Sequence, residues 1–139
     1  MHGRRSSRRA FLRLLPALGA ALATTAMRPR PLAARLPHPD PRPGVDASRV
    51  TPRTKLAKTP DLADLFDKVR EMPQIADGLA CRCGCMEDPS VRSLLSCFEG
   101  DGMATHCVIC QGQAETAHRL FKKGKSLAEI RAALDADFG

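Results

Sequence analysis

The sequence has no tryptophan and no tyrosine, and only five of its 139 residues are phenylalanine. Large aromatic side chains supply much of the buried area of most cores, so their scarcity leaves this chain a small hydrophobic contribution to folding. The sequence also lacks a Ser/His/Asp arrangement, a phosphate-binding loop and paired carboxylates at a useful spacing. These absences argue against an enzyme and favour a binding or scaffolding role.

Positive charge is abundant, but it is confined to the first part of the chain. Residues 1–60 contain 13 Lys and Arg against 2 Asp and Glu, which gives +11, whereas residues 61–139 contain 9 against 13, which gives −4. A nucleic-acid-binding protein places its positive field on the folded part that faces the phosphates. Because the part predicted to fold is acidic, we expect no nucleic-acid partner.

The first residues have the order of an export signal. Ser7–Arg13 reads Ser-Arg-Arg-Ala-Phe-Leu-Arg, which resembles the twin-arginine consensus. The apolar run after it, Leu14–Ala26, has 13 residues, whereas a membrane-spanning helix needs about 20. Small residues at its end offer cleavage sites. We predict a twin-arginine signal peptide at 1–26 and an exported protein, in the periplasm or on the extracytoplasmic side of the membrane.

This export route has consequences for partners and for the cysteines. The expected partner is the twin-arginine translocase, which carries cargo that is already folded. Contact with the membrane is then transient, or is kept only through an uncleaved signal. The cysteines would be organised in the cytoplasm, before the protein reaches an oxidising compartment.

Proline dominates the segment that follows the signal. Residues 28–60 hold eight of the eleven prolines, and each proline removes an amide donor and restricts the residue before it. We therefore predict a disordered, Pro/Arg-rich linker over residues 27–60, extended and solvated. His38 lies in this linker and is expected to be solvated as well.

The remaining residues, 61–139, are predicted to form an all-α domain: a small bundle of four to five short helices stapled around a cysteine cluster, without strands. Apolar residues recur at helical spacing. The helix ends are marked by Thr59 as an N-cap with Pro60 at the first helical position, by Gly124 after a helix C-terminus, and by the capping box Ser126–Glu129. The expected helices cover 61–70, a short stretch from Pro73, a stretch from Pro89 to Phe98, about 106–123, and Leu127 to Phe138. The acidic residues expected on a solvated helix face are Asp64, Asp67, Glu71 and Asp77.

All six cysteines lie in this domain, at positions Cys81, Cys83, Cys85, Cys97, Cys107 and Cys110. Their spacing resembles that of the PCYCGC-motif proteins, which are exported or lipid-anchored bacterial proteins. The resemblance covers roughly residues 61–139 and implies a fold and a compartment more than an activity. This chain departs from the family by having Ala80 where the motif has proline, Arg82 where it has tyrosine, and a twin-arginine signal instead of a lipobox.

Three chemistries are open to these cysteines, and we favour metal binding. A Cys-x-Cys-x-Cys turn and a Cys-x-x-Cys pair concentrate thiolates in a small volume, and thiolates suit copper(I) and zinc. Relatives commonly carry Gly-His where this chain has Ser90 and Val91, so His106 is the nearest substitute if that histidine is a ligand. The candidate ligands for a copper or zinc ion are Cys81, Cys83, Cys85, Cys97, Cys107, Cys110 and His106.

The two alternatives use the same thiols without a metal. In a disulfide-stapled interaction module, the three clustered cysteines are too close to pair with one another. Each would then pair with one of the later three, and each bridge would contribute about 2–4 kcal/mol. In a thiol-disulfide redox protein, Cys107 and Cys110 would form a Cys-x-x-Cys pair at a helix N-terminus. The chain shows no βαβ pattern of the kind that usually accompanies such a pair.

Overall fold

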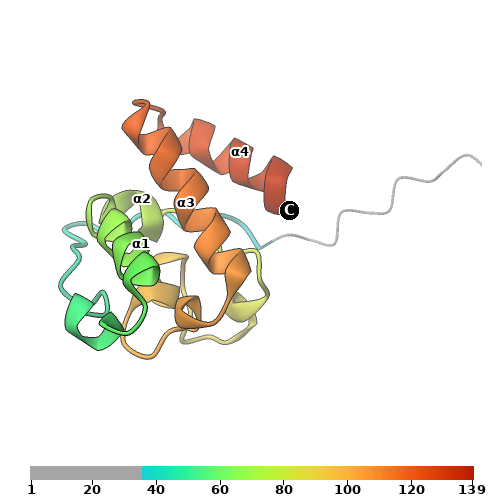
Figure 1. Cartoon of the computed structure of the whole chain (residues 1–139). Helices are drawn as coiled ribbons and strands as arrows, with labels where there is room; N and C mark the ends of the chain where they lie inside the picture. The colour runs from blue at the N-terminus through green and yellow to red at the C-terminus, as the bar shows by residue number, and fades with distance from the viewer. Residues whose placement is uncertain (1–35) are drawn as a thin grey trace, which may run out of the picture. The chain divides into compact units, whose positions relative to one another are not determined.

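The structure, a computed structural model, describes residues 36–139. The predicted signal peptide lies outside these residues. The described part is helical, as predicted, and contains no β-strand (Figure 1). No helix in it is long and apolar enough to cross a membrane. Its α-helices are α1 (Pro60–Arg70), α2 (Pro73–Asp77), α3 (Val108–Lys122) and α4 (Leu127–Phe138), and its 3-10 helices cover Arg53–Leu56, Cys85–Glu87, Leu95–Phe98 and Met103–Thr105.

Helix α1 begins as the sequence predicts, with Thr59 at the N-cap and Pro60 in the first turn. Proline is tolerated there because the first amides of a helix have no partner within the helix. Phe66 and Val69 on its inner face are fully buried. The Phe66 ring meets the Phe98 ring edge-on, with centroids 4.8 Å apart. This aromatic contact joins α1 to the irregular centre of the domain.

Helix α3 packs against α1 on one side and α4 on the other (Figure 1). It ends at a turn in which Gly124 has a φ of 73°, a left-handed conformation that favours glycine. Helix α4 then starts with the predicted capping box: the Glu129 amide donates to the Ser126 hydroxyl, and the Ser126 amide donates to the Glu129 carboxylate. Both helices are therefore positioned by their end residues as well as by packing.

The helix predicted from Pro89 to Phe98 is wrong in its first part. The Asp88 carboxylate accepts from the Ser90 amide at 2.8 Å, which holds a turn. The Leu94 amide donates to the Leu79 carbonyl at 2.7 Å instead of bonding within its own segment. Only Leu95–Phe98 is helical, as a single 3-10 turn. Leu94, Leu95 and Phe98 are buried as expected, but a bond to a distant part of the chain replaces the helical hydrogen bonds.

The linker prediction is wrong for residues 36–60, which belong to the same compact unit as the rest of the domain. Val50 and Leu56 are buried in the core. The Thr51 amide donates to the Phe98 carbonyl at 2.9 Å, next to an isolated antiparallel bridge between Val50 and Glu99. The prolines do prevent a long helix here. The extended segment nevertheless lies along the domain, because its few apolar side chains complete the core.

Asp77 also departs from its prediction, since it is fully buried rather than solvated. Its carboxylate accepts from the Arg42 guanidinium at 2.8 Å and from the Ser93 hydroxyl at 3.2 Å, and it pairs with Arg92 at 3.1 Å. Burial by itself raises the pKa of Asp77, but the hydrogen bonds from Arg42 outweigh this and hold the pKa below its usual value. The ion pair thus fixes the N-terminal segment to the end of α2.

Replacing Asp77 should therefore destabilise the domain strongly. We expect Asp77→Asn to lower the free energy of unfolding by about 2–3 kcal/mol. Loss of a completely buried pair costs more, but Arg42 and Arg92 are 41% and 37% exposed and stay partly hydrated. The matched control is Asp64→Asn, because Asp64 pairs with Arg53 at a 61% exposed position. It should change stability by less than about 0.5 kcal/mol in urea unfolding. Equal effects of the two substitutions would contradict this account.

Candidate metal centre

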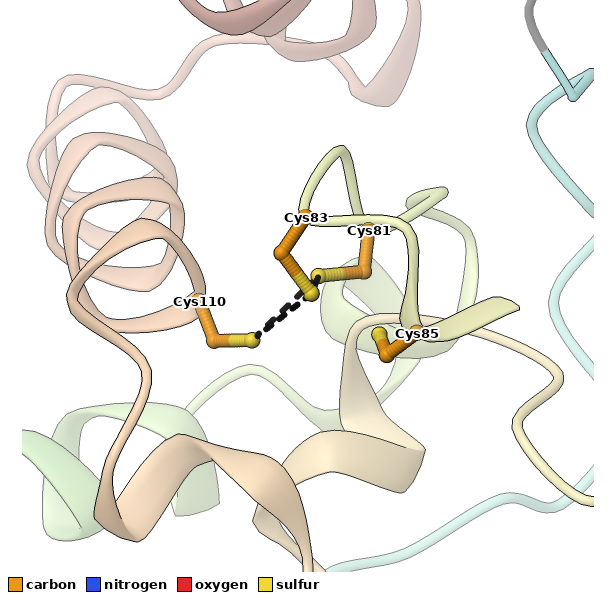
Figure 2. A group of neighbouring side chains, drawn as sticks. All are labelled: Cys81, Cys83, Cys85 and Cys110. Carbon is orange, nitrogen blue, oxygen red and sulfur yellow. Dashed lines mark hydrogen bonds between the residues drawn. The ribbon is translucent and has the colours of Figure 1, made fainter. Parts of the chain in front are cut away.

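The cysteine cluster forms where the loop after α2 meets the first turn of α3. Gly84 in this loop has a φ of 89°, which turns the chain sharply within the Cys-x-Cys-Gly-Cys run. Cys110 comes from α3 and faces the loop (Figure 2). The Sγ atom of Cys81 lies 3.3 Å from that of Cys83 and 3.4 Å from that of Cys110. Two segments far apart in sequence therefore bring three sulfurs together.

Cys85 completes a group of four, with Cys81, Cys83 and Cys110, whose Sγ atoms all lie within 4.8 Å of one another. Four sulfurs bound about 2.3 Å from a tetrahedral ion lie about 3.8 Å from one another. A disulfide bond, by contrast, is only about 2.05 Å long, and all six cysteines are free thiols here. The group has the spacing of ligands and can hold a metal ion.

The other two cysteines lie beside this group of four. The Sγ atom of Cys97 is 3.2 Å from that of Cys85, and Cys97 is buried. Cys107 is the N-cap of α3 and is half-buried. It lies one turn before Cys110, which is how the predicted Cys-x-x-Cys pair reaches the cluster.

His106 does not belong to the group. It is exposed, directly follows the 3-10 helix Met103–Thr105, and lines a separate surface pocket with Leu62 and Asp101. Among the described residues, the group of four therefore contains only sulfur ligands. The sequence places His106 next to Cys107, but adjacency in the chain does not bring its ring to the sulfurs.

Arg82, in the middle of the cysteine loop, is held from outside the cluster. Its Nε donates to the Asp135 carboxylate on α4 at 3.1 Å, and its Nη1 donates to the Leu36 carbonyl at 2.6 Å. The guanidinium therefore turns away from the sulfurs and ties the loop to α4 and to the N-terminal segment.

His38 supports the same loop, so its predicted solvation is wrong. Its Nδ1 accepts from the Ala80 amide at 2.9 Å, which leaves the proton on Nε2, and Nε2 lies 3.1 Å from the Asp135 carboxylate. Burial lowers the pKa of His38 below 6.5, and the nearby Asp135 carboxylate offsets this only in part. The neutral ring thus fixes the backbone immediately before Cys81.

Gln113 approaches the loop from α3, one turn after Cys110, and is fully buried. Its Oε1 accepts from the Arg82 amide at 3.2 Å. Its Nε2 has no hydrogen-bond partner among the residues that the structure describes. A buried amide donor without a partner is costly. Gln113 therefore restrains the cysteine loop through its Oε1 alone, while its amide nitrogen stays unpaired within the described residues.

Sequence reasoning missed these three supporting residues. The histidine was placed in a linker, Gln113 was not singled out, and Asp135 lies more than fifty residues from the loop that it holds. One feature of the sequence could have indicated such a support. Arg82 stands where the family motif has tyrosine, and an arginine that becomes buried requires an acidic partner.

The thiols affect one another's ionisation. Contacts with the thiols of Cys110 and Cys97 lower the pKa of Cys81. The contacts of Cys110 with Cys81 and Cys97, together with burial, raise the pKa of Cys110. Burial raises the pKa of Cys85 to about 12. In the metal-free cluster, one thiolate is therefore stabilised at the expense of its neighbours. A bound cation would favour ionisation of the others as well.

Comparison with known proteins identifies a family but not an activity. A family model described as "Protein of unknown function with PCYCGC motif" matches residues 44–139. No curated protein and no solved structure matches the chain. The matched region includes part of the segment that the sequence analysis assigned to the linker, in agreement with the packing of residues 36–60.

Acidic pH should weaken the support that His38 gives to the loop. Because its folded pKa lies below the unfolded value of 6.5, its stabilising effect is present above pH 6.5 and is lost as the pH falls through the folded pKa. We expect the free energy of unfolding of the metal-free protein to decrease below about pH 6.5, and to decrease less in His38→Gln. Measurements above about pH 5 avoid protonation of Asp135. Identical slopes in the two proteins would disprove the effect.

Cys107 should react faster than Cys97 in the reduced, metal-free protein. Burial raises its pKa, but hydrogen bonds from the Cys110 amide and thiol outweigh this and lower it. Cys97 is buried, and its pKa is raised to about 12. At a pH just below the usual thiol value of 9.0, we expect iodoacetamide to label Cys107 at least about tenfold faster than Cys97. Peptide mapping measures the rates, and the denatured chain is the control. Faster labelling of Cys97 in the folded protein would contradict the prediction.

Proposed function

The chain belongs to the PCYCGC-motif family, and we propose that it is an exported protein that binds a soft transition metal, copper or zinc, through clustered thiolates. The observation that carries the proposal is the group of four sulfurs, from Cys81, Cys83, Cys85 and Cys110, within 4.8 Å of one another. Four thiolates at this spacing suit a closed site, of the type that stabilises a fold and holds its ion without catalysing a reaction.

The donor set supports a soft metal. Hard cations such as calcium and magnesium require oxygen ligands, and the group of four offers only sulfur. Cys81 and Cys110 are also buried, which keeps water from competing for the ion. When bound, the metal replaces thiol protons and links the cysteine loop to α3. Such a link adds the binding free energy to the stability of a small core.

The residues around the sulfurs hold the ligands in place. The Arg82 guanidinium donates to the Asp135 carboxylate, and the Arg82 backbone amide donates to the Gln113 side-chain oxygen. The loop is therefore restrained by both α4 and α3. His38 restrains the residue before Cys81. Such supporting contacts commonly change metal affinity by about 10–100-fold. The binding geometry would therefore be prepared before the ion arrives.

The export assignment rests on the sequence of residues 1–26. A twin-arginine signal delivers folded cargo, which supports loading of the metal in the cytoplasm, followed by transport through the translocase. In this order the thiols are occupied before they meet an oxidising compartment. The exported protein would then be found in the periplasm or on the outer side of the membrane.

A second candidate, the disulfide-stapled module, is favoured by one contact. The sulfurs of Cys85 and Cys97 lie 3.2 Å apart. In this alternative each cysteine of the first three pairs with one of the last three, and Cys85 with Cys97 is such a pair. A redox role is favoured by the lowered pKa of Cys107 beside Cys110. Both alternatives require oxidised cysteines in the exported protein, whereas the metal site requires thiolates.

Native mass spectrometry of the exported protein, purified without oxygen and without chelators, distinguishes these states. We expect a mass that includes copper or zinc, with all six cysteines open to alkylation after chelation. The Cys81→Ser/Cys110→Ser variant should bind the metal more than about 100-fold more weakly, since it loses two ligands. The matched control, Cys97→Ser/Cys107→Ser, keeps the group of four and should keep a metal ion.

The opposite result is equally clear. A metal-free mass that is lower by two hydrogens for each cysteine pair, and thiols that resist alkylation until reduced, would replace the metal proposal with the disulfide module. Partial oxidation confined to Cys107 and Cys110 would favour the redox protein instead.

A further inference from the structure

The cluster holds more sulfur than one tetrahedral ion can use. A closed zinc site takes four thiolates, yet the Cys97 sulfur lies 3.2 Å from that of Cys85. Cys97 is 1% exposed, so it is enclosed with the cluster rather than directed to solvent. A mononuclear site at the group of four leaves this buried thiol without a use.

Cys107 extends the cluster on its other side. It is the N-cap of α3 and lies three residues before Cys110. Residues three apart at the start of a helix lie one turn apart on the same side, so Cys107 is next to Cys110 on the helix. The other five sulfurs are linked by the group of four, within 4.8 Å of one another, and by the 3.2 Å contact between Cys85 and Cys97. All six cysteines therefore gather where the loop meets the first turn of α3.

The negative charge of the thiolates also bears on how many cations the cluster binds. When all six thiols become ligands, six thiolates in a partly buried volume repel one another, so the bound cations must neutralise them. Arg82 lies within the cysteine loop, but its guanidinium is bound to Asp135 and to the Leu36 carbonyl. It therefore does not neutralise the thiolates. A single divalent ion leaves most of the charge of six thiolates uncompensated. Several monovalent ions, each shared between sulfurs, neutralise it more completely.

We propose that the six cysteines form one polynuclear copper(I) site, in which thiolates bridge several Cu(I) ions. This inference rests on the proposed function and deepens it by naming the metal and its number. Copper(I) is soft, and thiolates select it; a thiolate sulfur also has lone pairs enough to bridge two ions. Each thiol that becomes a ligand releases its proton to solvent. Copper enters and stays as Cu(I), so neither an oxidant nor a reductant takes part.

The test is a titration of the reduced full-length protein under nitrogen, followed by native mass spectrometry. In one series Cu(I) is added as its acetonitrile complex, and in the other Zn(II) is added as a simple salt. We expect more than one Cu(I) ion per chain but a single Zn(II) ion. Cys97→Ser/Cys107→Ser should keep its Zn(II) ion and lose at least one Cu(I) ion per chain.

Two further variants keep the result interpretable. Cys107→Ser alone changes a half-buried end residue of α3, so it should reduce the Cu(I) capacity even if replacing buried Cys97 impairs folding. Cys81→Ser/Cys110→Ser should lose both metals. Retained Zn(II) binding and an unchanged helical circular dichroism spectrum show that a variant is folded.

The possible outcomes separate the two proposals. One Cu(I) and one Zn(II) ion per chain would leave the metal-binding function in place and overturn the polynuclear site. An unchanged Cu(I) capacity in folded Cys97→Ser/Cys107→Ser would also overturn it. Failure of the wild-type protein to bind either metal would overturn both proposals.

Discussion

The contact between the cysteine loop and the first turn of α3 is the constraint on which the rest of the structure depends. With so few aromatic residues, the domain uses buried Cys81, Cys97 and Cys110 as core residues. The same thiols that fill the centre are therefore the ones that can bind a metal. Packing and chemistry are coupled here, because any change at these positions alters both the core and the candidate site.

The elements around this contact hold it from three directions. Helix α3 carries Cys110 and Gln113, α4 supplies Asp135, and the extended N-terminal segment brings His38 to the loop. Asp77 fixes that segment to the end of α2 through Arg42. The polar contacts are long-range in sequence and partly buried. They restrain a loop that has almost no regular secondary structure of its own, which suits a site whose ligands must stay in place.

Local signals predicted the helices whose ends and faces are set by neighbouring residues. Thr59 with Pro60, and Ser126 with Glu129, mark the starts of α1 and α4 correctly. The prediction failed after Pro89, where the Leu94 amide bonds to Leu79 instead of completing a helix. It also failed for Asp77 and for residues 36–60. In each of these cases the decisive partner lies outside the local sequence.

The sequence alone determined that this is a helical, cysteine-rich domain with a specific spacing of six thiols, because helix caps, apolar periodicity and cysteine positions are local properties. Only the tertiary structure decided which thiols meet. It joined Cys110 to the loop and left exposed His106 outside the group, although the sequence favoured both as ligands. It also brought His38, Gln113 and Asp135 into contact with the cysteine loop. Distances between side chains depend on how distant segments pack, and spacing along the chain does not specify that.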